Sequence, residues 1–444
     1  MAATTGSIKQ NADLDSVLND ARQRFVDRNP KSLARHIDAK QSLPGGNTRT
    51  ILWYNPFPLT LVSGNGCYVT DFDGHQYVDL LSEYTAGLYG HSDPTIAEAM
   101  IDAIREGVML GGPNRYEAHL GAAIVDRFPA IERVRFCNSG TEANIMALAA
   151  ARAVTGRTKI LAFKESYHGG VMCFANGGSP LNLPFPFLLA DYNDEVGVEK
   201  MMREHADDLA AVILEPMLGA GGCIVAKPNF LPRLRGLADE LGVILIFDEV
   251  QTSRLGYRAL HGELGILPDM VALGKYIGGG ASFGAFGGKA SIMDRFDPAR
   301  VNSFSHGGTF NNNVLSMAAG LAGFTKVLTE EASRRVNAIG DWLRSETNTA
   351  LERHAVAAVV LGRGSLMNLH FVDGVVETPA QLKERDVRWL ELWHVEMVLR
   401  GFYVAPRGLV ALSLPFGENE AERFLAAFDD FLAVHRSLLP TRTS

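Results

Sequence analysis

Two charged residues beside short apolar runs constrain the fold of this 444-residue chain more than any other feature. Asp248 directly follows the run Val243–Phe247, and Lys275 follows Met270–Leu273 after one glycine. Short apolar runs of this kind are typical of buried parallel strands. Each charge therefore comes at the carboxyl end of a strand, the edge at which open α/β sheets bind ligands. The pattern predicts an α/β fold with a ligand site at this edge; a structural ion pair is the alternative.

An aldehyde cofactor with a pyridine ring would use both charged residues. Lys275 could form a Schiff base with the aldehyde. Asp248 could keep the ring nitrogen protonated, so that the ring draws electrons from the substrate carbon. Pyridoxal 5'-phosphate is the cofactor with this chemistry.

A second segment predicts a place for the phosphate group. After the expected strand Arg133–Cys137 comes N-S-G-T-E-A-N, in which Gly140 allows a tight turn, and a strongly helix-forming stretch follows. Ser139 and Thr141 would open this helix. Hydroxyls and free N–H groups at a helix N-terminus make an anion site. An ordinary helix cap is the alternative reading of the same residues.

Six motifs in order connect these residues to a known family: S-G-T-E-A-N, Y-H-G, E-P, F-D-E-V, G-K-Y-I-G-G-G and G-G-T-F. Together they resemble the fold-type I, class III pyridoxal phosphate aminotransferases, over nearly the whole chain. The G-G-G after the lysine and the stretch S-F-G-A-F-G-G are similar to the branch that contains glutamate-1-semialdehyde aminomutase. Closer still is the similarity to bacterial β-phenylalanine aminotransferases. The resemblance implies a large domain with a mostly parallel sheet and a smaller α+β domain built from the N- and C-terminal segments.

The resemblance also implies roles for single residues. Tyr167 would stack on the pyridine ring, Val250 would pack on the opposite face, and Glu215 would support the site from near the cofactor. His168 is either held neutral by local hydrogen bonds or catalytic. Thr309 matches a threonine that family members send across a dimer interface to the partner's phosphate, although the segment also reads as a plain turn. The expected cofactor-binding set is Ser139, Gly140, Thr141, Tyr167, His168, Glu215, Asp248, Val250, Lys275 and Thr309, with Lys275 and Asp248 catalytic.

Two arginines are expected to bind a substrate carboxylate. Arg407 lies where the mutase pattern has no arginine, and Arg49 lies where β-phenylalanine aminotransferases also carry one. A planar guanidinium can grip a carboxylate through two parallel hydrogen bonds. Each could instead be an ordinary surface or ion-pairing arginine. The aromatic residues at 53–57, with Tyr84 and Tyr89, fit an aromatic-lined pocket and core packing equally well.

The expected function is transfer of the amino group of an aromatic β-amino acid, such as β-phenylalanine, to 2-oxoglutarate or pyruvate. A glutamate-1-semialdehyde aminomutase is the main alternative, with Arg407 against it, and a broad-specificity amine transaminase is another. A non-catalytic binding protein is disfavoured by the presence of both Lys275 and Asp248. The expected partners are a small amino donor, a keto-acid acceptor and a second copy of the chain, in a homodimer with active sites at the interface.

Composition is that of an ordinary enzyme of this size. The net charge of −8 and the lack of a long basic run argue against a nucleic-acid surface. The chain begins without an apolar signal-peptide core and has no apolar stretch of membrane-spanning length, so we expect a cytoplasmic protein with no membrane partner. The four cysteines are scattered without a Cys-x-x-Cys pair, and no metal site is expected.

Changes in pattern along the chain predict three segments. Residues 1–80 form an N-terminal part of the small domain, residues 81–325 form the large cofactor-binding domain, and residues 326–444 form the C-terminal part of the small domain. In the middle segment strand-like runs alternate with helical ones, which is typical of a mostly parallel sheet. No low-complexity linker separates the segments.

Overall fold

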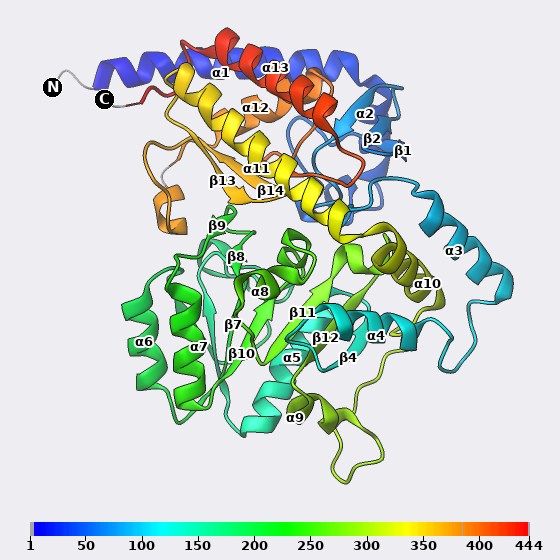
Figure 1. The fold of residues 1–444 in the computed structure, drawn as a ribbon. Coiled ribbons are helices and arrows are strands. Elements are labelled where there is room, and N and C mark those ends of the chain that lie inside the picture. Colours follow the sequence, from blue (N-terminus) through cyan, green and yellow to red (C-terminus); the bar gives the residue numbers. More distant parts are fainter. Residues whose placement is uncertain (1–3, 384, 443–444) are drawn as a thin grey trace.

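A seven-stranded sheet forms the lower half of the molecule in Figure 1, a computed structural model that describes residues 4–383 and 385–442. The strand order is β4-β12-β11-β10-β7-β5-β6. Only β12 runs antiparallel to its neighbours, so the prediction of a mostly parallel sheet is confirmed. The strands are β4 (Arg133–Cys137), β5 (Lys159–Phe163), β6 (Phe187–Ala190), β7 (Leu209–Leu214), β10 (Ile244–Asp248), β11 (Met270–Gly274) and β12 (Gly284–Gly288).

Both faces of this sheet are buried, which explains why its strands read as continuous apolar runs. Along β10, Leu245 and Phe247 pack in the cluster that includes α7 (Phe230–Leu241), whereas Ile246 packs with α5 (Gly140–Thr155) on the other face. Alternate side chains of a strand point to opposite faces, so a helix covers each side. The other helices of this half are α3 (Pro94–Glu106), α4 (Glu117–Arg127), α6 (Glu195–Glu204), α8 (Ala259–Leu264), α9 (Ala290–Met293) and α10 (Val314–Ala322), and the short hairpin strands are β8 (Met217–Leu218) and β9 (Ile224–Val225).

The upper half joins the two ends of the chain in one sheet. The N-terminal strands β1 (Leu61–Asn65), β2 (Tyr68–Asp71) and β3 (Gln76–Asp79) are completed by β15 (Phe402–Tyr403), which pairs parallel with β3. A small domain built from both terminal segments is therefore confirmed. A second sheet in the order β13-β14-β16 lies beside it. Its strands are β13 (Val359–Arg363), β14 (Leu366–His370) and β16 (Leu409–Ala411), and the helices are α1 (Thr4–Arg28), α2 (Pro30–Ala39), α11 (Glu330–Arg353), α12 (Arg388–Leu399) and α13 (Glu418–His435).

The exact segment limits at residues 80 and 325 stay a prediction.

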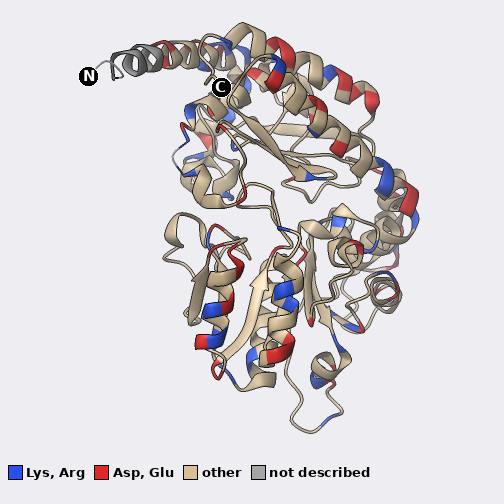
Figure 2. Cartoon of the chain, turned by 60° about the vertical axis from the view of Figure 1, so that its left-hand side comes forward, with Lys and Arg blue, Asp and Glu red and all other residues tan. Residues whose placement is uncertain are grey.

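Lys, Arg, Asp and Glu lie mainly along the outer helices, while the strands are almost free of them (Figure 2). Within the described residues, no helix is both long and apolar enough to cross a membrane. The same residues contain no group of three or more histidine, cysteine or acidic side chains placed to hold a metal ion.

A buried carboxylate ties the helices of the small domain together. Glu396 on α12 is 2% exposed, and its Oε1 lies 2.6 Å from Arg24 of α1 and 3.4 Å from His435 of α13. Arg400 pairs with the other carboxylate oxygen. Burial alone would raise the pKa of Glu396, but these three partners outweigh it and lower the pKa to about 2.

Replacing Glu396 by glutamine is expected to destabilise the fold at neutral pH. The folded-state pKa lies below the ordinary value of 4.5, so the carboxylate stabilises the protein above about pH 4.5, and this contribution is lost as the pH falls toward 2. Removing one partner of a buried ion pair costs about 3–5 kcal/mol. Thermal unfolding should show a lower Tm for Glu396→Gln at pH 7 and a narrowing difference below pH 4.5. Glu346→Gln, at an exposed position of α11, is the control. A difference that is constant with pH would contradict the argument.

Candidate active site

Strand register brings three predicted segments to one edge of the large sheet. Gly284 of β12 pairs with Gly274, the last residue of β11, and with Cys137, the last residue of β4. The carboxyl ends of β11 and β4 therefore lie at the same edge of the sheet. A Cβ atom at Gly284 would lie 2.1 Å from the Ser139 carbonyl oxygen, so only glycine permits this approach. Asp248 ends the neighbouring strand β10. The site is therefore set by three strand ends.

Asp248 is a buried carboxylate, 3% exposed, held by three donors. Its Oδ2 accepts hydrogen bonds from Asn144 Nδ2 at 2.7 Å and from His168 Nδ1 at 2.8 Å, and its Oδ1 accepts one from the Val250 N–H at 3.0 Å. Among the described residues, no lysine or arginine forms an ion pair with it. A buried carboxylate without such a partner suits a cationic ligand atom.

His168 is buried and holds Asp248 from one side. Its Nε2 has no hydrogen-bond partner among the described residues, and its backbone oxygen accepts from Asn144. The geometry favours the reading of a histidine held by local hydrogen bonds. Asn144 did not enter the predicted site, although it ends the motif S-G-T-E-A-N; its spacing of one helical turn from Gly140 was the available signal.

Lys275 follows β11 at the same edge of the sheet and is partly buried. Its Nζ donates to the Tyr84 carbonyl oxygen and to Thr85 Oγ1, both at 2.6 Å. The pKa of Lys275 is lowered to about 7. Burial is the largest cause, and the positive charge of Arg407 is the second. A lysine with such a pKa supplies neutral amine near neutral pH, and a neutral amine is the form that attacks an aldehyde or accepts a proton.

The N-terminus of α5 adjoins these residues. Ser139 caps the helix by accepting a hydrogen bond from the Glu142 N–H at 3.1 Å, so the ordinary capping role is present. Gly140 packs against Val250, and a Cβ atom there would lie 2.7 Å from that side chain. Gly169 in turn touches Thr141. Residues 169 and 250 therefore pack directly against the N-terminus of α5. The helix dipole at this end favours the binding of an anion.

Tyr167 follows β5 and Glu215 follows β7, at the same edge of the sheet. Tyr167 is 45% exposed, which leaves its ring free for a ligand. Its N–H donates to Glu215, which also accepts hydrogen bonds from the backbone of Gly219 and Ala220. The pKa of Glu215 is raised to about 7, mainly by burial and secondly by the negative charge of Asp248. Glu215 is therefore satisfied by backbone N–H groups rather than by a charged side chain.

Arg49 and Arg407 meet at one ring, although they come from opposite ends of the chain. Their guanidinium carbons lie 5.6 Å and 5.7 Å from the centre of the Tyr84 ring. Arg49 forms an ion pair with the exposed Glu83. Arg407 has a buried Nε without a hydrogen-bond partner, and no carboxylate pairs with it in the part of the chain that is described. Of the other aromatic candidates, Tyr54 and Tyr89 pack in the core.

Among the described residues, Thr309 forms no hydrogen bond with the other predicted site residues. It is exposed on the loop that leads to α10. The loop itself is fixed to the start of α5, because Asn138 Nδ2 donates to Asn311 Oδ1 at 3.0 Å. A contact between Thr309 and a phosphate in a partner subunit stays a prediction.

The residues present fit pyridoxal phosphate. Asp248 offers a buried carboxylate for a protonated ring nitrogen, the α5 N-terminus offers N–H groups for the phosphate, and Lys275 offers an amine for the aldehyde. Tyr167 and Val250 would lie on the two faces of the ring. These roles, like those of Ser139, Gly140 and Thr141, remain proposals about the site.

Comparison with known proteins agrees with this chemistry. Residues 52–391 match the family model described as aminotransferase class-III. The chain is 47% identical to a β-phenylalanine transaminase of Variovorax paradoxus, over 97% of this chain and 99% of that protein. The crystal structure of a β-phenylalanine aminotransferase from Variovorax paradoxus superposes with a TM-score of 0.95, at 46% identity, over 97% of this chain and 100% of that one.

More distant relatives are also similar over most of their length. A solved transaminase with PLP bound has a TM-score of 0.84 at 32% identity and covers 91% of this chain and 98% of its own. Glutamate-1-semialdehyde 2,1-aminomutase 2 of Halalkalibacterium halodurans is 34% identical over 88% of this chain and 95% of that protein.

Proposed function

Because the chain belongs to the class-III aminotransferases, we propose that this enzyme, which depends on pyridoxal phosphate, transfers the amino group of an aromatic β-amino acid. The donor we propose is 3-amino-3-phenylpropanoate (β-phenylalanine), and the acceptor is 2-oxoglutarate or pyruvate. The similarity to a β-phenylalanine transaminase over nearly the whole chain supports this donor.

The convergence of Arg49 and Arg407 on Tyr84 is the observation that carries the proposal. Two guanidinium groups at the Tyr84 ring, one of which (Arg407) acts on the charge of Lys275, favour substrates that bear carboxylates. In a β-amino acid the carboxylate lies one carbon further from the reacting carbon than in an α-amino acid. The two kinds of substrate therefore need cations at different places. We assign the β-amino acid carboxylate to Arg49, where it would replace Glu83 as the ion-pair partner. We assign a carboxylate of the acceptor to Arg407.

The residues of the site divide the work of the reaction. Pyridoxal phosphate, when bound, supplies an aldehyde carbon that takes up the amino group and a ring that withdraws electrons. Lys275 Nζ takes the proton from the amine-bearing carbon of the substrate and would then deliver it to the aldehyde-derived carbon of the cofactor. Asp248 holds the proton of the ring nitrogen, and His168 and Asn144 hold Asp248 in place. Tyr167 limits movement of the ring.

A two-step absorbance experiment tests the donor. The purified holoenzyme is mixed first with 3-amino-3-phenylpropanoate alone and then with 2-oxoglutarate, while the cofactor absorbance is followed. We expect the original band to disappear on the first addition and to return on the second. A band that responds to neither addition would exclude this donor. A band that responds only to glutamate-1-semialdehyde would favour an aminomutase instead.

Substituting the two arginines is expected to separate donor from acceptor. Loss of two charge-assisted hydrogen bonds costs about 100-fold in kcat/KM. Arg49→Ala should lose this factor for the β-amino acid, and Arg407→Ala should lose it for 2-oxoglutarate. Arg407→Lys keeps the charge but not the planar fork, so it should recover only part of the loss. Steady-state kinetics with each substrate varied in turn measures the effects.

The control for the arginine variants is Arg105→Ala, at an exposed position of α3. It should leave both values of kcat/KM unchanged. Equal losses for donor and acceptor in both active-site variants would mean that Arg49 and Arg407 act structurally.

We also propose that the enzyme is a cytoplasmic homodimer in which Thr309 reaches the partner's phosphate. Support comes from exposed apolar side chains near its loop. Met109 and Leu110 are 76% and 58% exposed, and Phe310 is 51% exposed. Asn114 Nδ2 donates to the Asn312 carbonyl oxygen at 2.8 Å, and Asn312 Nδ2 donates to the Gly112 carbonyl oxygen, so the two segments lie side by side. Exposed apolar patches of this kind mark interaction surfaces. Sedimentation of the purified protein measures the oligomeric state.

A further inference from the structure

The segment Ser82–Thr85 has an unusual backbone directly at the catalytic lysine. Its four residues all have positive φ angles of 44°, 48°, 50° and 79°, although none is glycine. Side chains with a Cβ atom rarely adopt this left-handed region, and runs of such residues persist only where surrounding contacts force them. The segment supplies both acceptors of Lys275, the Tyr84 carbonyl oxygen and Thr85 Oγ1.

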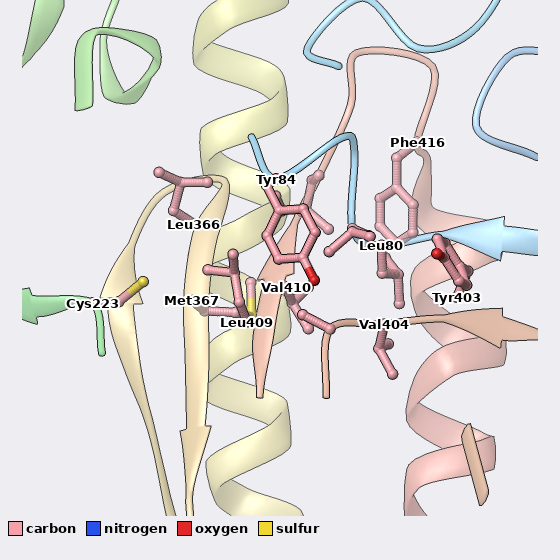
Figure 3. Close-up of a cluster of buried hydrophobic side chains, with 14 of the residues drawn as sticks. Leu80, Tyr84, Cys223, Leu366, Met367, Tyr403, Val404, Leu409, Val410 and Phe416 are labelled. Atoms are coloured by element: carbon pink, nitrogen blue, oxygen red, sulfur yellow. The ribbon is translucent and has the colours of Figure 1, made fainter. Parts of the chain in front are cut away.

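Contacts from both halves of the molecule fix this segment. At its start, Asp79 accepts hydrogen bonds from the N–H groups of Leu81 and Ser82, and the Ser82 hydroxyl donates to the Ala411 carbonyl oxygen of β16. Figure 3 shows Leu80 and Tyr84 among apolar side chains of β14 and β16, which belong to the small domain. The segment therefore cannot relax without disturbing this packing.

Arg254 holds the other end of the segment. It follows β10 in the sequence, is 2% exposed, and donates to the Thr85 carbonyl oxygen at 3.1 Å. Its other donors reach Ser365 Oγ and the Leu412 carbonyl oxygen. Among the described residues, no carboxylate pairs with Arg254, and the acceptors of its side-chain hydrogen bonds are neutral oxygens. Burying a cation in this way is costly, so a residue that only fills space would be better apolar.

We propose that Thr85 Oγ1 and the Tyr84 carbonyl form a seat for the free amine of Lys275, and that Arg254 is a positioning residue that holds this seat. A neutral amine has two N–H bonds and one lone pair. The two acceptors take the two N–H bonds, which leaves the lone pair for the substrate proton. After the lysine takes up that proton it has a third N–H bond. It would then pass the proton to the aldehyde-derived carbon of the cofactor, so that the free amine returns to the seat. The inference rests on the proposed role of Lys275 in transamination.

The first test removes the Thr85 hydroxyl while keeping the side-chain shape. Thr85→Val should slow the donor half-reaction about tenfold, the effect of losing one hydrogen bond, with KM unchanged. Thr85→Ser, which keeps the hydroxyl, should restore the rate. Thr349→Val, at an exposed position of α11, is the control. A serine variant as slow as the valine variant would overturn the role of the hydroxyl.

A second readout does not depend on turnover. Full-length protein freed of cofactor is pulsed with acetic anhydride across a pH series, and acetylation of Lys275 is measured by peptide mass spectrometry. Because the hydroxyl oxygen stabilises the ammonium form more than the amine, Thr85→Val should move the midpoint of the labelling curve to lower pH. A wild-type labelling curve and a wild-type rate in Thr85→Val would refute the seat. The proposed function would then still be supported if Lys275→Ala is inactive.

A double-mutant cycle tests whether Arg254 acts through Thr85. Arg254→Lys keeps the charge but cannot reach all three oxygens, and it should also slow the half-reaction about tenfold. If Arg254 works by placing the seat, the variant that combines it with Thr85→Val should be about as slow as either single variant. Fully additive losses, or a wild-type rate in Arg254→Lys, would overturn the assignment. Thermal unfolding of each variant separates these effects from loss of fold.

Discussion

Lys275→Ala is expected to slow transamination by about four orders of magnitude, the loss that follows removal of a general base that also carries the covalent link. Alanine can neither bond to the cofactor aldehyde nor carry a proton. The Lys275 side chain is partly buried, and within the described residues its amine donates hydrogen bonds to the Tyr84 carbonyl oxygen and Thr85 Oγ1 alone. The fold should therefore survive the substitution. Rapid-mixing absorbance of the donor half-reaction measures the rate, and the retained cofactor is measured on denatured protein.

The matched control is Lys200→Ala, whose side chain is 74% exposed on α6. It should have the wild-type rate. Added ethylamine should restore part of the rate of Lys275→Ala, since a small amine can occupy the space that the side chain leaves. Retained turnover in Lys275→Ala would remove the lysine from the mechanism and, with it, the assignment of this edge of the sheet as the active site.

The central sheet and the position of Lys275 and Asp248 were predictable because they depend on local sequence. A strand buried on both faces needs a short apolar run. A charged residue directly after such a run therefore lies at the edge of the sheet where the strand ends. The resemblance in six motifs then indicated which cofactor these charges serve. The same local signals placed Ser139 at the start of α5, where it caps the helix.

Residues that support the site from a distance were not predictable in this way. Thr85 contacts Lys275, and Arg254 contacts Thr85, in a segment that β16 of the small domain holds through Ser82. Their sequence surroundings, E-Y-T-A-G and T-S-R-L, carry no periodic signal for that contact. The meeting of Arg49 and Arg407 at Tyr84 likewise depends on how the two chain ends fold together, and only the resemblance indicated either arginine.

Asp248→Asn is expected to slow turnover about 100- to 1000-fold while the cofactor stays bound. Each of the three hydrogen bonds to Asp248 comes from a donor, so the amide NH2 of asparagine would face another donor. The neutral amide also gives up the negative charge that keeps a ring nitrogen protonated. The α5 N-terminus and Lys275 are unchanged by the substitution, and they should still hold the cofactor. The half-reaction rate and the cofactor content of the purified variant measure the two effects separately.

Asp191→Asn is the control, because this carboxylate is half exposed and, in the described part of the chain, pairs only with Lys164 at the surface. It should change neither rate nor cofactor content. A loss of cofactor together with activity in Asp248→Asn would mean that the carboxylate mainly shapes the site with His168 and Asn144. A near-normal rate with cofactor bound would contradict the electron-withdrawing role of the ring, because the reaction would then proceed without the charge that Asp248 supplies.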